Sequence, residues 1–155
     1  MTDPHGGQPS TLSEIQSALD ETCQYLLSHH EPSDYHRCYT LQIRGHSVHL
    51  CARCLGLYPG IAVGVGCFLT NLFSPIHFFL VALLPLPALI DWSVTHLLAP
   101  EGSNTVRTIT GGLLGIGYGI GLGYVLVERA PTVVVIGLFY AVAAGVVLWR
   151  YYGEP

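Results

Sequence analysis

Four long stretches of the chain are almost entirely apolar, and this feature constrains the fold more than any other. Each is close to the roughly 20 residues that an α-helix needs to cross the hydrocarbon core of a bilayer. None shows the charged face of a surface helix, and a soluble domain of 155 residues is too small to bury all four. The sequence therefore predicts four transmembrane helices, at Leu57–Phe73, Ile76–Ala99, Thr108–Val127 and Pro131–Trp149.

The charge content supports a membrane protein and excludes several other classes. Only 10% of the residues are charged, whereas an ordinary soluble domain carries roughly a quarter. The net charge of −4 excludes a cationic surface for nucleic acid, so the expected surroundings are a lipid bilayer and no nucleic acid. The first 34 residues lack the basic and apolar regions of a secretory signal, so no cleavable signal is expected.

The arginines predict the orientation of the helices. An even number of spans places both termini on one side of the membrane, and positive charge is retained in the cytoplasm. Five of the six arginines fall on the side of the termini, and Arg129 falls on the other. We therefore expect a multi-pass protein of the inner or plasma membrane with both termini in the cytoplasm. The five arginines are Arg37, Arg44, Arg53, Arg107 and Arg150.

Glycines predict which helices pack together. Small residues mark the contact faces of apolar helices because they let two backbones approach closely. The third predicted span has a glycine at every fourth position from Gly111 to Gly123, and the first span has Gly56, Gly60 and Gly64. We expect these two spans to be neighbours.

Two prolines interrupt the second predicted span. Pro85 and Pro87 each remove a backbone hydrogen bond from the helix, so a kink is expected there. Such kinks occur for purely structural reasons and also beside binding sites, and we favour the structural interpretation.

The N-terminal segment is acidic and predicts one helix outside the membrane. Thr11 and Glu14 form a capping box, and apolar residues then recur at helical spacing before Pro32. The predicted fold is thus an all-α membrane protein with four transmembrane helices, an N-terminal cytoplasmic amphipathic helix and a short cysteine-rich hairpin. Its predicted segments are residues 1–34, the cysteine hairpin at 35–56 and the transmembrane domain at 57–150.

The cysteine segment between these parts carries the most distinctive chemistry. Apolar residues alternate on both sides of Gly45, which indicates a β-hairpin with its turn near Arg44–His46. The hairpin would bring Cys38 close to the Cys51-x-x-Cys54 pair. Three thiolates and one imidazole make a tetrahedral Cys₃His site, for which His36 and His49 are the candidate fourth ligands.

Three uses of these cysteines compete. The first is a metal site, for which mixed thiolate and imidazole ligands favour zinc, with iron as the second choice. A filled ligand shell would make this site structural. The second is a redox dithiol, with Cys54 near the start of a helix whose dipole lowers a thiol pKa, although no βαβ pattern surrounds it. The third is that the cysteines are ordinary small residues at a membrane boundary.

Asp91 forms a second candidate site inside the second span. An ionisable residue within a span is costly and indicates a function by default. Its expected partner is Arg107, with Ser103 and Asn104 supplying hydrogen bonds and His96 one turn away. A purely structural ion pair is an equal alternative. Asp91, Arg107 and the cysteines are all expected at one membrane face.

Two sequence motifs, taken together, are distinctive enough to indicate a relationship to other proteins. They are Cys51-Ala-Arg-Cys54-Leu-Gly56-Leu-Tyr58-Pro-Gly60, and Asp91 followed by Ser103-Asn104-x-x-Arg107-x-x-Thr110-Gly111. Over roughly residues 36–125 the chain resembles the domain-of-unknown-function 2085 family of small predicted prokaryotic membrane proteins. The resemblance implies a membrane location and no activity.

The resemblance also adds candidate site residues. It carries Cys38, Arg53 and Tyr58 over, together with the second motif. The family often places Cys and His together upstream, whereas this chain has His36-Arg37-Cys38, so the fourth ligand stays open.

Three functions follow as hypotheses. The first is a non-catalytic membrane module whose zinc site orders the cytoplasmic face for a lipid-soluble ligand or a protein partner. The second is a membrane-embedded enzyme that acts on a lipid-soluble substrate through Asp91, Arg107 and the cysteine site. The third is a small transporter, which the scarcity of charges in the spans disfavours.

Overall fold

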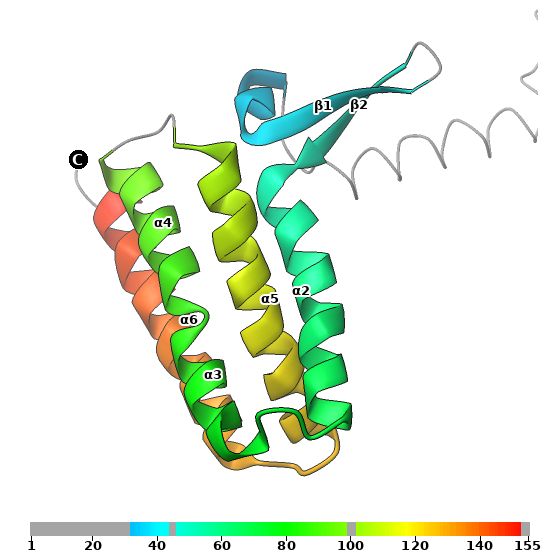
Figure 1. The fold of residues 1–155 in the computed structure, drawn as a ribbon. Helices are drawn as coiled ribbons and strands as arrows, with labels where there is room; N and C mark the ends of the chain where they lie inside the picture. Colours follow the sequence, from blue (N-terminus) through cyan, green and yellow to red (C-terminus); the bar gives the residue numbers. More distant parts are fainter. Residues whose placement is uncertain (1–31, 44–45, 99–101, 153–155) are drawn as a thin grey trace, which may run out of the picture.

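Four long apolar helices and one small hairpin make up the described part of the chain (Figure 1). The computed structural model describes residues 32–43, 46–98 and 102–152, and the predicted N-terminal helix lies outside these ranges. All four helices are long and apolar enough to cross a membrane, which confirms the four predicted spans. Their bounds are Ala52–Leu69 (α2), Ser74–Leu97, Asn104–Leu126 (α5) and Pro131–Tyr152 (α6).

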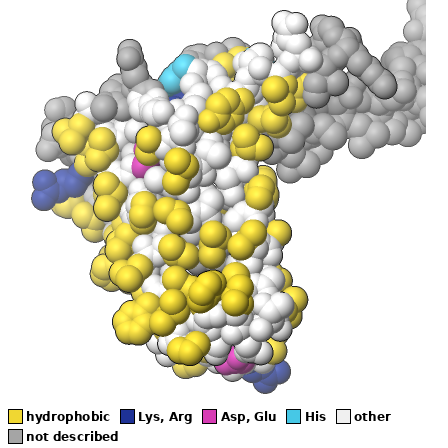
Figure 2. Space-filling view, in the orientation of Figure 1, with side chains coloured by type: hydrophobic (Ala, Val, Ile, Leu, Met, Phe, Trp, Pro, Cys, Tyr) yellow, Lys and Arg dark blue, Asp and Glu magenta, His cyan; other side chains and the backbone are white. Residues whose placement is uncertain are grey.

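The surface of the helical body is apolar along its length. Large side chains such as Phe79 and Phe139, each 66% exposed, point outward from the helices. Figure 2 shows hydrophobic side chains spread over the helices and basic ones only near the two ends of the body. This distribution is typical of a surface that faces lipid.

Helices α2 and α5 are in direct backbone contact, as the glycine pattern predicted. A Cβ atom added at Gly60, Gly64 or Gly119 would overlap a backbone carbonyl oxygen of the facing helix. Only glycine leaves room for this approach, and the resulting contacts replace the hydrophobic driving force that apolar helices lack in lipid.

The second span is broken where its prolines predicted a kink. It consists of a short 3₁₀ turn, η2 (Ser74–Ile76), followed by α3 (His77–Leu83) and α4 (Leu86–Leu97). The interruption falls at Leu84 and Pro85, because a proline cannot donate the helical hydrogen bond.

The best-packed core lies toward the end of the bundle away from the hairpin. Val81, Ile120, Tyr124 and Val133 form a buried cluster there. Beside it His77 is 1% exposed, and its ring lies 3.2 Å from the Tyr124 hydroxyl and 2.6 Å from the Leu72 carbonyl oxygen. Both ring nitrogens are therefore satisfied, so this histidine serves the packing of the bundle.

The hairpin covers the other end of α2 and α5 (Figure 1). A 3₁₀ turn, η1 (Pro32–Arg37), leads into β1 (Cys38–Ile43), which pairs antiparallel with β2 (His46–Cys51). This confirms the predicted hairpin, while residues 44–45 of its predicted turn lie outside the described residues. Strand β2 runs directly into α2, which begins at Ala52 rather than at the predicted Leu57. Arg53 and Cys54 therefore belong to the first turn of a membrane helix.

Candidate functional site

Polar side chains of α5 hold the hairpin in place. The Asn104 side-chain amide donates to the carbonyl oxygens of His36 at 3.0 Å and Cys38 at 3.3 Å. The Thr108 hydroxyl donates to the carbonyl oxygen of Ala52 at 2.9 Å, just after the end of β2. Both ends of the hairpin are thus tied to one helix, which fixes the cysteines relative to the bundle.

The hairpin brings the three predicted cysteines to one place. Cys38 and Cys51 are paired across the two strands, so their side chains lie on the same face of the hairpin. Cys51 caps the start of α2, and its thiol shares a hydrogen bond with that of Cys54.

Cys38 lies outside the membrane helices, at the start of β1. It is buried, and this burial raises the pKa of its thiol. Neighbouring Cys51 and Asp34 raise the pKa further, while Arg107 opposes them. Cys38 is therefore protonated at neutral pH.

The predicted zinc site stays a prediction. Among the described residues, no group of three or more His, Cys, Asp and Glu side chains is arranged to hold a metal ion. The His49 ring lies 3.0 Å from the Thr40 hydroxyl and stacks on Tyr35 at 3.8 Å. His36 is exposed and accepts a hydrogen bond from Arg37.

Asp91 forms a close ion pair with Arg53, which the sequence did not predict, and the predicted partner Arg107 also interacts electrostatically with Asp91. The Arg53 guanidinium lies 2.5 Å from the Asp91 carboxylate, whose side chain is only 8% exposed. Arg107 is buried and donates to the Asn104 side-chain oxygen at 3.0 Å. Arg53 can reach Asp91 because α2 is in close contact with α5: Gly111 lies directly against the Arg53 backbone, which lets the guanidinium reach α4.

Arg53 and Arg107, but not Asp91, line a cavity of about 440 Å³ at the hairpin end of the bundle, which we call the polar cavity. His96 contributes to its wall, because it lies on α4 near Trp92. The cavity combines guanidinium donors with the Cys51 and Cys54 thiols. Its lining residues are Arg37, Cys51, Arg53, Cys54, Leu57, Trp92, Thr95, His96 and Arg107.

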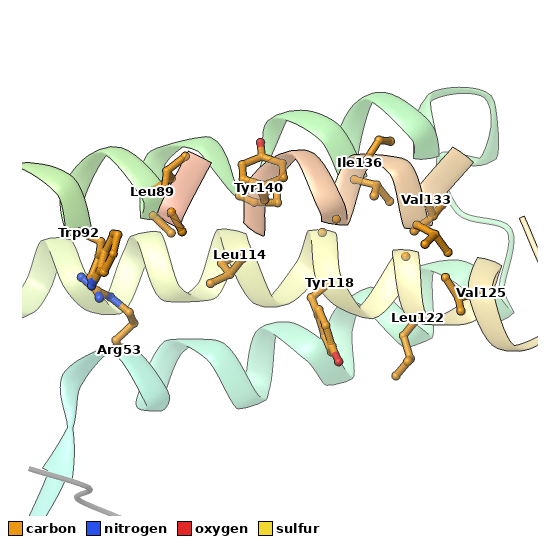
Figure 3. A pocket seen from close by; sticks show the side chains of 18 residues that line it. Arg53, Leu89, Trp92, Leu114, Tyr118, Leu122, Val125, Val133, Ile136 and Tyr140 are labelled. Carbon is orange, nitrogen blue, oxygen red and sulfur yellow. The ribbon is translucent and has the colours of Figure 1, made fainter. Parts of the chain in front are cut away.

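A second, apolar cavity of about 660 Å³ continues into the bundle between α3, α4, α5 and α6. Figure 3 shows Arg53 and Trp92 together at one end, with apolar side chains such as Leu114, Val133 and Ile136 beyond them. Arg53 and Trp92 line both cavities. These two side chains therefore form part of the wall of both spaces.

Seven of the predicted site residues do not line either cavity, namely His36, Cys38, His49, Tyr58, Asp91, Ser103 and Asn104. Tyr58 is 59% exposed on α2. Ser103 is exposed, precedes α5 and makes no capping hydrogen bond with its side chain. In contrast, the sequence did not single out Trp92 and Thr95 as site residues. Their positions one and four residues after Asp91 were the only signal in the sequence that could have found them.

The comparison with known families agrees with this architecture. Residues 34–121 match the family described as "Predicted membrane protein (DUF2085)". The chain belongs to this family. The matched range includes every residue that lines the polar cavity, whereas α6 lies outside it. No curated protein and no solved structure matches the chain.

Proposed function

We propose that this protein binds an amphiphilic, lipid-soluble ligand. The apolar part of the ligand occupies the cavity between α4, α5 and α6, and its polar head occupies the cavity under the hairpin. The observation that carries the proposal is that Arg53 and Trp92 line both an apolar and a polar cavity.

The sizes and linings of the cavities support this proposal. Ligand pockets commonly have volumes of about 300–1,000 Å³, with apolar walls and a few polar groups that orient the ligand. Arginine presents a fork of N–H donors that suits a head bearing acceptor oxygens. The Nε of Arg53 is buried and makes no hydrogen bond within the described residues, so one donor of this side chain remains to be satisfied.

The ligand can reach the cavity from the bilayer. Tyr118 and Val134 line the apolar cavity and are more than half exposed on the lipid-facing surface. A molecule dissolved in the membrane therefore meets the apolar cavity first and the arginines last. On the predicted orientation, its head lies at the cytoplasmic face.

A fluorescence experiment tests the proposal. The chain has two tryptophans, so a Trp149→Phe variant leaves Trp92, which lines both cavities, as the reporter. Stearate with a nitroxide near its carboxyl group is added to this purified full-length variant in detergent micelles. We expect saturable quenching of Trp92 fluorescence.

Two matched glycines on α6 supply the controls. A Cβ atom at Gly137 or at Gly145 meets no other atom within 4 Å, but only Gly137 lines the apolar cavity. Gly137→Phe should abolish saturable quenching, and Gly145→Phe should preserve it. Quenching that never saturates, and that is equal in both variants, would show that the probe only dissolves in the micelle and would refute the proposal.

A further inference from the structure

The Cys51 and Cys54 thiols line the polar cavity within hydrogen-bonding contact of each other. We propose that they form a dithiol–disulfide couple that exchanges two electrons with a quinone-class ligand held in the two cavities. This inference rests on the proposed function, because it assigns a chemical class to the lipid-soluble ligand.

The local backbone already suits a disulfide. Cys51 is the N-cap of α2 and Cys54 lies in its first turn, and residues three apart on a helix have Cβ atoms about 5–6 Å apart. A disulfide needs its Cβ atoms only slightly closer, about 3.5–4.5 Å apart. A small adjustment at the helix end therefore closes the bond, while Asn104 and Thr108 keep the hairpin attached to α5.

The cavities determine what can exchange electrons with these thiols. The partner must dissolve in lipid to enter the apolar cavity, and it must accept two electrons and two protons together. Its head must also present acceptor oxygens to Arg53 and lie beside the Trp92 ring. A quinone with an apolar tail meets all of these conditions, because its flat ring carries two carbonyl oxygens.

The reaction balances without any further reactant. The two S–H bonds of Cys51 and Cys54 break, and one S–S bond forms between their sulfur atoms. The two electrons and two protons pass to the quinone, whose two carbonyl groups become the hydroxyl groups of a hydroquinone. The direction is set by the difference in reduction potential between the two couples.

The zinc site predicted from the sequence uses the same thiols, but it predicts that they do not form a disulfide. Cys51 and Cys54 bound to a structural zinc ion are held as thiolates in a closed shell and cannot form a disulfide. The metal content of the purified protein therefore separates the two uses of these cysteines.

The test uses the reduced full-length protein in lipid nanodiscs without oxygen. A benzoquinone with a ten-carbon chain is added, and the loss of quinone absorbance is followed. We expect one hydroquinone to form per protein, and peptide mass spectrometry should then locate a disulfide between Cys51 and Cys54. Zinc is measured on the same preparation and should be absent from these thiols.

Variants identify the thiols and the cavity. Cys51→Ser and Cys54→Ser should each reduce hydroquinone formation to the rate without protein. Cys67→Ser is the matched control, since Cys67 lies farther along α2 beside the apolar core, and it should react normally. Gly137→Phe should slow the reaction by about a hundredfold, because it removes the cavity that holds the quinone near the thiols.

Each contrary result has a distinct meaning. Stoichiometric zinc on Cys51 and Cys54, a disulfide between Cys38 and Cys51, or equal hydroquinone formation by the serine variants would overturn the redox couple. If nitroxide stearate still quenches Trp92 saturably in that case, the proposed ligand-binding function survives. If the thiols react but Gly137→Phe has no effect, then the quinone does not use the apolar cavity, and the inference fails in that part.

Discussion

The backbone contact between α2 and α5 makes the effect of a single methyl group calculable. A Cβ atom at Gly115 would overlap the carbonyl oxygen of Leu57 and would lie 2.9 Å from the amide nitrogen of Ile61. Both atoms belong to the backbone, so no side chain can rotate away. At Gly112, one turn earlier on α5, the nearest atom is 3.7 Å away, which is an ordinary contact. Gly115→Ala should therefore separate the helices, and Gly112→Ala should not.

The comparison of the two variants isolates the cost of this overlap. Replacing glycine with alanine favours a helix by up to about 1 kcal/mol, and this gain is common to both positions. Overpacking of a well-packed contact costs about 1–3 kcal/mol. Gly115→Ala should thus lower the free energy of unfolding by about 1–3 kcal/mol relative to Gly112→Ala.

Reversible unfolding in mixed micelles with a rising fraction of SDS measures this difference. Helix content followed by circular dichroism gives the free energy of unfolding for each variant. Equal stability of Gly112→Ala and Gly115→Ala would refute the assigned contact between α2 and α5. It would also contradict our explanation that the close contact of α2 with α5 lets Arg53 reach Asp91.

Three further predictions concern the polar end of the bundle. Asp91→Asn should lower the free energy of unfolding by about 2–3 kcal/mol by leaving Arg53 without its carboxylate, and Arg53→Gln in the same chain should restore part of the loss in the same SDS assay. Burial raises the pKa of Cys38 above the ordinary 9.0, so iodoacetamide should modify it at half its maximal rate only above pH 9.0, as peptide mass spectrometry can show. The contribution of the protonated Cys38 thiol to the free energy of unfolding should be constant below pH 9.0 and should decrease above it. The Cys38→Ser variant should lack this decrease. Asn104→Ala should speed hydrogen exchange in the hairpin, because it removes the hydrogen bonds to the η1 turn and to the first strand. Thr105→Ala, at an exposed neighbouring position, should not.

Much of the fold follows from local pattern. Apolar length predicts the four spans, because a helix in lipid must satisfy its own backbone hydrogen bonds over the full thickness of the core. Glycine spacing predicts the contact between α2 and α5, because a missing side chain is visible in the sequence and acts where two backbones meet. Pro85 and the alternation around Gly45 likewise predict the break in the second span and the hairpin.

The candidate site was only partly predictable. The sequence identifies Cys51, Cys54, Asp91 and Arg107 as the unusual polar groups, and the structure brings their neighbourhoods to one end of the bundle. Which arginine meets Asp91 depends on how closely α2 approaches α5 and how far a flexible side chain reaches across it. No spacing along the chain encodes that distance.

Local patterns in the sequence are enough to predict the four apolar spans, the cysteine hairpin and the two glycine-faced helices, since each of these depends on residues close together in the chain. The ion pair between Arg53 and Asp91, and the two cavities that share Arg53 and Trp92 in their walls, depend instead on how the helices pack. A cavity is the space left by side chains of several helices, so it exists only once their separations and rotations are set.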